Sequence, residues 1–148
     1  MARVPELDQF AMRELPDGRR FDEAVHIVHV YTLEAHPALP DMTPYSMWTD
    51  GNDMPDGSGN SYGDVGQAYT WAERRAQAHR VLNGMENEPL MLIDALSPDP
   101  LTNPVWCTYA TAPNPAFVID QDGTIVLSQL WSEMSAIERA ITALVTGD

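Results

Sequence analysis

The stretch from Ala24 to Leu33 constrains the fold of this chain most, because it reads AVHIVHVYTL and contains no acidic residue, lysine or arginine. β-Branched and aromatic residues dominate it, and such a run is typical of a β-strand. A strand without charge is expected to be buried on both faces, which proteins achieve by packing helices against both sides of a sheet. We therefore expect an α/β protein.

The other periodic segments supply helices and a hairpin around this strand. Three segments have apolar residues at helical spacing, and one short apolar run is typical of a further strand. An Asp-Gly turn between two β-branched runs is the strongest short-range signal for a hairpin. The predicted helices are Val4–Leu15, Gln67–Leu82 and Met134–Val145, with Ser132 as the cap of the last, and the predicted strands are Leu90–Asp94, Ala116–Asp120 and Thr124–Gln129. One side of the second helix carries Ala68, Trp71, Ala72, Arg75, Ala78 and Leu82. Leu96–Tyr109, interrupted by prolines, is expected to be irregular.

The order helix, strand, helix, strand, hairpin, helix predicts the topology. A right-handed parallel crossover followed by an antiparallel hairpin gives a small mixed sheet with helices on both faces. This is the thioredoxin-like arrangement from its first helix onward, so the N-terminal strand of that fold is missing. We expect a single domain over residues 1–148, with a long loop insertion at about 37–66 after the first retained strand.

Charge and cysteine content narrow the function. The chain has 22 acidic against 8 basic side chains, all of the latter arginine, and a net charge of −14. Such a field repels phosphate backbones and anionic lipids, so we expect no nucleic-acid and no membrane partner. The single Cys107 excludes an internal disulfide and a zinc ribbon. MARVPELDQF lacks the pattern of a signal peptide, and no apolar run is long enough to span a bilayer, so a cytoplasmic location is expected.

The end of the first strand carries the strongest candidate for chemistry. Glu34 and His36 lie two residues apart in Glu-Ala-His-Pro, so both point to the same side of an extended backbone. The carboxyl ends of strands are where open α/β sheets place ligand sites. Glu34 and His36 together can relay protons, because the carboxylate orients the imidazole and raises its basicity. The alternative is that both residues only solvate the end of the strand.

Two further positions belong to the expected site. Pro115 stands directly before the strand that begins at Ala116. Thioredoxin-like domains place a cis proline there, which leaves the preceding backbone, here Asn114, available to an extended thiol substrate. The alternative is an ordinary trans proline in a turn. Cys107 is the one thiol of the chain and is either redox-active or a packed cysteine.

Several segments together resemble the iodothyronine deiodinase-like family of thioredoxin-fold proteins. They are VHVYTLEAHP, the long loop with Trp48 and Asn52, AERRAQAHRVL, PLMLIDAL and TYATAPNPAFVIDQDGTIV, which cover about residues 4 to 130. The resemblance implies a thiol- or selenol-based reductive site in which Glu34 and His36 relay protons. Tyr31, Trp48, Asn114 and Pro115 are expected to bind the substrate.

The chain also departs from that family. The family has a cysteine or selenocysteine nucleophile before the first helix, and here no Cys, Ser or Thr precedes Thr32. The glycine-rich stretch that follows the family's last hairpin is replaced by Ser128-Gln129-Leu130-Trp131. Cys107 is the remaining candidate nucleophile.

No cofactor or metal is expected. The glycines form no dinucleotide or phosphate-binding fingerprint. His26 and His29 lie three apart in one predicted strand and so are expected to point to opposite faces, which disfavours a shared metal. Three functions stay open: a deiodinase-like oxidoreductase, a repurposed small-molecule enzyme or ligand-binding module, and a structural subunit that pairs through its exposed sheet edge in a homo- or hetero-oligomer.

Overall fold

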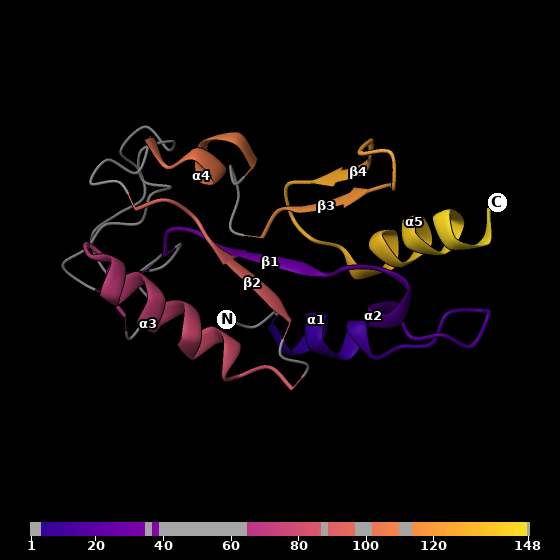
Figure 1. Cartoon of the computed structure of the whole chain (residues 1–148), viewed down its shortest axis with the longest axis horizontal. Coiled ribbons are helices and arrows are strands. Elements are labelled where there is room, and N and C mark those ends of the chain that lie inside the picture. Colours follow the sequence, from indigo (N-terminus) through magenta and orange to yellow (C-terminus); the bar gives the residue numbers. More distant parts are fainter. Residues whose placement is uncertain are drawn as a thin grey trace, which may run out of the picture.

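The computed structural model describes residues 4–34, 37–38, 65–86, 89–96, 102–109 and 114–147. Over these ranges the protein is a mixed α/β structure with five helices and two small sheets, one parallel and one antiparallel (Figure 1). The elements are α1 (Val4–Ala11), α2 (Phe21–Ala24), β1 (Val28–Tyr31), α3 (Trp71–Leu82), β2 (Leu90–Ile93), α4 (Pro104–Tyr109), β3 (Ala116–Ile119), β4 (Ile125–Gln129) and α5 (Met134–Thr146). None of the helices in these ranges is long and apolar enough to cross a bilayer.

Strands β1 and β2 pair in parallel, with Val28 opposite Leu90 and Tyr31 opposite Ile93, and α3 lies between them in the chain and packs against β2. The prediction that this strand runs from Ala24 to Leu33 and is buried on both faces is wrong. Its first residue belongs to α2, and on one face of the sheet the aliphatic side chains are 41–59% exposed. These are Val28, Val30, Leu90 and Leu92. In the part of the chain that the structure describes, only the face that carries His29 and Tyr31 is half-buried.

The predicted hairpin is confirmed. Strands β3 and β4 pair antiparallel, and Gly123 at the turn has φ 84°, which only glycine adopts without strain. The Asp120 carboxylate accepts hydrogen bonds from the N–H groups of Asp122 and Thr124, which fixes the turn. Between the described residues the hairpin forms a sheet of its own instead of extending β1 and β2, so the single mixed sheet that we expected is present as two sheets.

The hydrophobic core lies where α1, α2, the hairpin and α5 meet. Its fully buried members are Phe10, Leu15, Phe21, Val118, Ile137 and Ile141. The rings of Phe10 and Phe21 lie 4.5 Å apart between centroids. Ile137 and Ile141 lie four residues apart in the predicted helix Met134–Val145 and are both buried, which confirms the helical spacing of that segment.

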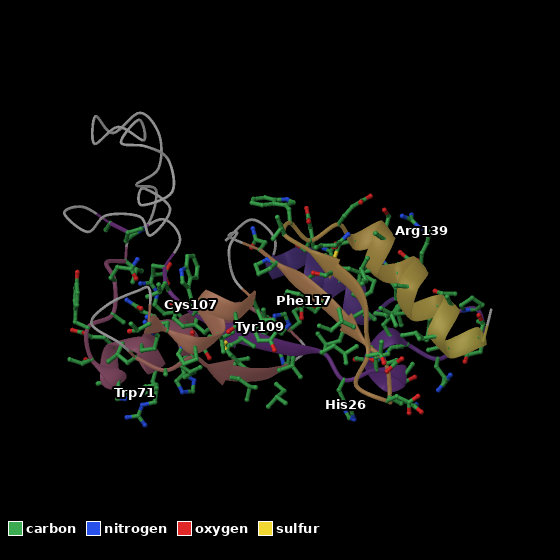
Figure 2. All side chains as sticks on the ribbon, turned by 90° about the horizontal axis from the view of Figure 1, so that it is seen from above. His26, Trp71, Cys107, Tyr109, Phe117 and Arg139 are labelled. Carbon is green, nitrogen blue, oxygen red and sulfur yellow. The ribbon has the colours of Figure 1, made fainter. Side chains whose placement is uncertain are left out.

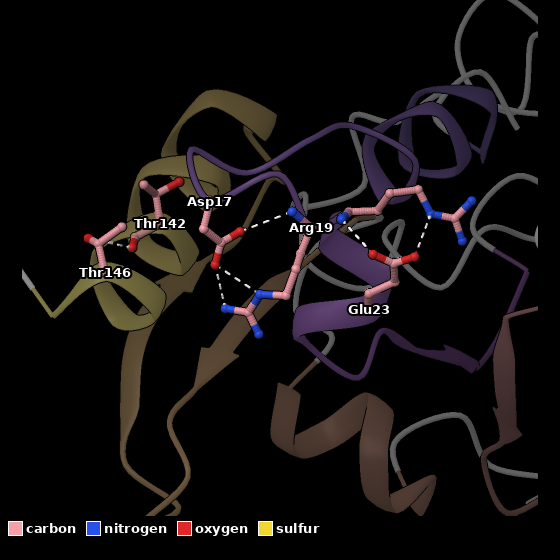
Figure 3. Close-up of polar contacts among 6 residues, drawn as sticks. Asp17, Arg19, Glu23, Thr142 and Thr146 are labelled. Carbon is pink, nitrogen blue, oxygen red and sulfur yellow. Dashed lines mark hydrogen bonds and ion pairs between the residues drawn. The ribbon is translucent and has the colours of Figure 1, made fainter.

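Helix α1 ends at Ala11, four residues before the predicted end at Leu15. The chain turns back on itself instead, because Leu15 donates its N–H to the carbonyl of Arg19 at 2.7 Å and Gly18 adopts φ 85°. Asp17 holds the turn with hydrogen bonds from the backbone and side chain of Arg19 (Figure 3). Leu15 reaches the core from this turn rather than from the helix.

Three other helix predictions need correction. The N-cap of α5 is Glu133, not Ser132, although Gly147 ends the helix in the left-handed conformation. Helix α4 forms the last six residues of the segment that we expected to be irregular, and Pro104 occupies its first position. Helix α3 begins at Trp71 behind a capping box formed by Thr70 and Glu73, and it buries Arg74 and Ala78 while Trp71 and Arg75 are exposed.

Helix α4 connects the parallel sheet to the part of the molecule that contains the hairpin. Its Trp106 is buried, and the ring of its last residue, Tyr109, packs edge-on against Phe117 of β3 with a centroid distance of 5.3 Å (Figure 2). The amino end of α4 is held by the residue that follows β2, as described below. The helix therefore contacts both the residue that follows β2 and the hairpin.

Candidate functional site

Polar side chains gather where β1 and β2 end. We name Tyr31, Glu34, Arg74, Gln77 and Asp94 the strand-end cluster; the first two come from β1 and the residues after it, Arg74 and Gln77 from α3, and Asp94 directly follows β2. Parallel strands bring their carboxyl ends to one edge of the sheet (Figure 1), and ligand sites in α/β proteins lie at that edge. The strand-end cluster is therefore the main candidate for an active site in the described structure.

Tyr31 and Glu34 are directly hydrogen-bonded. The Tyr31 hydroxyl donates to Glu34 Oε1, and Gln77 Oε1 lies 3.2 Å from the same hydroxyl as a second acceptor. Gln77 Nε2 donates to the carbonyl of Gly66 at 2.8 Å, which keeps the amide oxygen turned toward Tyr31. Burial raises the pKa of Tyr31, and the hydrogen bond and charge of Glu34 raise it further. Tyr31 is therefore a protonated hydrogen-bond donor at neutral pH.

Gln67 fixes the backbone of Glu34 from both sides. The Glu34 N–H donates to Gln67 Oε1 at 3.1 Å, and Gln67 Nε2 donates to the Glu34 carbonyl at 2.6 Å. This pair of bonds replaces the ladder partners that the chain loses when β1 ends at Tyr31. The carboxylate is thus held beside Tyr31 although it belongs to a loop.

Arg74 is the most deeply buried charged residue of the cluster, with 1% of its surface exposed. Its Nη1 donates to the carbonyl of Thr32 at 2.7 Å, directly after β1. Burial lowers the pKa of Arg74, and the nearby acidic groups Tyr31, Asp94 and Glu34 oppose that change. The guanidinium is therefore the positive centre around which the acidic groups lie.

Asp94 joins the two strands to α4. Its N–H donates to the carbonyl of Tyr31 at 2.9 Å, which extends the parallel pairing by one residue. Its buried carboxylate accepts from the N–H groups of Ala95, Val105 and Trp106 at 2.7, 3.2 and 3.0 Å. Two of these N–H groups belong to the first turn of α4, where a helix has no internal acceptors. Asp94 therefore positions α4, and with it Cys107.

The structure places the expected site residues in three groups. Tyr31 and Glu34 come together in the strand-end cluster, whereas His36 and Trp48 lie outside the described residues. Cys107 is exposed on α4 (Figure 2) and directly follows Val105 and Trp106, whose N–H groups Asp94 binds. Asn114 and Pro115 lie at the start of β3, where the Asn114 carbonyl accepts from the N–H of Ser132 at 2.7 Å.

Sequence reasoning missed four polar residues of this region. Arg74 and Gln77 lie three apart on the predicted helix and so share a face, but the apolar spacing favoured a different face. Asp94 was expected as the last residue of a buried strand, although an aspartate before an irregular segment is also a common capping residue. No pattern in the chain indicates that Gln67 binds the backbone of Glu34.

A second polar region lies at the opposite end of the parallel sheet. A cleft of about 210 Å³ is lined by residues of α1, α2 and the entries to β1 and β2, among them Asp8, Asp22, His26 and His29. The prediction that the two histidines point to opposite faces of one strand is wrong, because β1 begins at Val28 and His26 precedes it. Burial lowers the pKa of His29, and Asp8 opposes this. Within the described ranges no group of three or more such side chains is arranged to hold a metal ion.

Comparisons of the chain with protein families, with curated proteins and with solved structures find no match.

Proposed function

We propose that this protein is a small-molecule enzyme of the thioredoxin-like, deiodinase-like kind, in which Glu34 takes up and releases protons at the end of β1. The observation that carries the proposal is the hydrogen bond between the Tyr31 hydroxyl and the Glu34 carboxylate at the carboxyl edge of a parallel sheet. His36, two residues after Glu34 in the sequence, is the proposed second member of the relay.

The arrangement suits a group that changes its protonation state. The Tyr31 hydroxyl has one proton and two acceptors, Glu34 and Gln77. When Glu34 is ionised, Tyr31 donates to it. When Glu34 is protonated, its acid hydrogen can bind the Tyr31 oxygen while Tyr31 donates to Gln77. Both states keep their hydrogen bonds, so a proton can arrive or leave without rearrangement of the site.

The order of elements supports the thioredoxin-like part of the proposal. Parallel β1 and β2 joined through α3 are followed by an antiparallel hairpin and a final helix, and Pro115 directly precedes β3.

Cys107 is the proposed thiol, because Asp94 ties α4 to the strand-end cluster and the cysteine is exposed. In a reductive dehalogenation, the Cys107 thiolate accepts the halogen from carbon and the relay supplies the proton to that carbon. A second thiol then releases halide and forms a disulfide with Cys107, and excess reductant restores the thiol.

The test uses the full chain with 3,5-diiodotyrosine and excess dithiothreitol, and it measures iodide release. We expect Glu34→Gln to lower turnover by about 10²-fold or more, the usual contribution of a positioned acid or base. Cys107→Ser is expected to abolish turnover. Glu138→Gln, on the exposed side of α5, is the matched control and should behave as the wild type. Wild-type turnover in Glu34→Gln with an unchanged circular dichroism spectrum would contradict the acid–base role.

One observation favours a second function, that of a subunit that pairs with another chain. The exposed aliphatic face of β1 and β2, together with edges that no other strand of the described ranges pairs with, is the kind of surface that a partner covers. Size-exclusion chromatography with light scattering on the same preparations separates the two proposals. A monomer at micromolar concentration that releases iodide supports the enzyme, and a stable oligomer without turnover supports the subunit.

A further inference from the structure

Arg74 carries a buried donor that its surroundings do not satisfy. Its side chain is 1% exposed, and Nη1 is bonded to the Thr32 carbonyl. Nη2 is equally buried and has no hydrogen-bond partner among the residues that the structure describes. A buried N–H of a charged group without an acceptor is costly, and proteins rarely keep one without a reason.

The neighbouring carboxylates do not compensate this donor. Asp94 uses both oxygens on backbone N–H groups, and Glu34 accepts from Tyr31. The ion pairs found between described residues involve arginines at other positions, namely Arg13, Arg19 and Arg20. Arg74 is therefore a buried cation that feels negative charge nearby without a direct ion pair in the described structure.

We propose that Arg74 Nη2 binds a carboxylate group of the substrate at the strand-end cluster. A guanidinium N–H and a carboxylate oxygen form a strong charge-assisted hydrogen bond, and burial strengthens it. A singly charged carboxylate fits better than a phosphate, because Glu34 and Asp94 lie close by and repel a dianion more strongly. That the ligand is a substrate rests on the proposed function, whereas the binding of a carboxylate does not require turnover.

The test is thermal unfolding of the full chain in sodium acetate against sodium chloride at equal ionic strength. With acetate in excess of its dissociation constant, we expect the Tm of the wild type to rise by about 2–5 °C. Arg74→Met should lose this rise, and methionine is long and apolar enough to fill the buried position. Arg75→Met is the matched control, because Arg75 is the next residue of α3 and is exposed. Its rise should equal that of the wild type.

Three results would overturn the proposal: no acetate-dependent rise in the wild type, an equal rise in Arg74→Met, or a rise that phosphate produces and acetate does not. If Arg74→Met fails to fold, an NMR titration of the wild type with acetate still tests the proposal. Its Arg74 Nε–H resonance, assigned by its loss in Arg74→Lys, should shift as acetate is added, and an unchanged resonance overturns the proposal.

Glu34→Gln separates this proposal from the function on which it rests. We expect this variant to keep the acetate-dependent rise in Tm, because Arg74 is intact, while it loses turnover. If Glu34→Gln loses turnover and Arg74→Met keeps the rise, the acid–base role stands and the carboxylate site fails. If Glu34→Gln turns over normally and only Arg74→Met loses the rise, the carboxylate site stands and the acid–base role fails.

Discussion

The two ends of this molecule are stabilised by different interactions. The end formed by α1, α2, the hairpin and α5 packs apolar side chains around Phe21, Val118 and Ile137 (Figure 1). The end formed by β1, β2, α3 and α4 is organised by directional bonds that meet at Tyr31, Arg74 and Asp94. Apolar burial stabilises without regard to direction, whereas each polar group of the strand-end cluster needs a partner at a fixed position.

This difference separates stability from function. An apolar core tolerates substitutions that preserve volume, and it offers no chemistry to a ligand. The strand-end cluster gains little net stability from each hydrogen bond, but it holds a carboxylate, a phenol and a guanidinium in one place. We therefore expect large losses of stability from the apolar end and specific losses of activity from the polar end.

Phe21→Ala should produce the largest loss of stability. Phe21 is 1% exposed and contacts Phe10 across the junction of α1 and α2, so its removal leaves a cavity in the core. The expected cost is about 3–5 kcal/mol in the free energy of unfolding, measured by urea denaturation. Ile119→Ala is the control, because Ile119 is 57% exposed, and it should cost far less. Equal costs for the two variants would mean that the core does not lie where we place it.

Asp94→Ala should cost less, about 1–3 kcal/mol, because it leaves buried backbone N–H groups at the start of α4 without acceptors. Hydrogen exchange gives the local measurement: the amides of Val105 and Trp106 should exchange faster while those of the hairpin keep their protection. The exposed Asp122→Ala is the control. Unchanged protection of both α4 amides in Asp94→Ala would show that its carboxylate does not hold the helix.

The apolar end was the more predictable of the two from the sequence. The Asp-Gly turn fixes the hairpin locally, and Ile137 and Ile141 mark the buried side of α5 by their spacing. Boundaries were less predictable. The hydrogen bond from the Leu15 N–H to the Arg19 carbonyl closes a chain reversal after α1. Such a turn competes with a helix, although the apolar spacing of the helix continues to Leu15.

The strand-end cluster was predictable only in part. Tyr31 and Glu34 are close in sequence, so the contact between them follows from the end of one strand. Arg74 lies on another element, and burial of an arginine depends on groups that the chain brings together only on folding. Apolar periodicity assigns Arg75 rather than Arg74 to the apolar side of the helix, because periodicity does not detect a charged side chain that is buried with hydrogen bonds.

The free energy of unfolding at alkaline pH reports directly on the buried phenol of Tyr31. Burial raises the pKa of Tyr31, so above about pH 10 the folded state holds a proton that the unfolded state releases. The free energy of unfolding must then fall as pH rises, by up to about 1.4 kcal/mol per pH unit from this group. The chain has no lysine, so tyrosines and one cysteine dominate this range. Tyr31→Phe should remove most of the slope, measured by urea denaturation between pH 9 and pH 11.

Glu34→Gln should have the smallest effect on the pH dependence of unfolding, and it tests which cause of the raised Tyr31 pKa is larger. Glu34 raises the pKa of Tyr31 through its hydrogen bond and its charge, but burial is the larger cause. The slope should therefore persist in Glu34→Gln, because the phenol is still buried, but it should level off at a lower pH than in the wild type, because the pKa of the folded state is raised less. A slope in Glu34→Gln as flat as that in Tyr31→Phe would mean that the carboxylate, not burial, keeps the phenol protonated, and the strand-end cluster would then be more open to water than its geometry indicates.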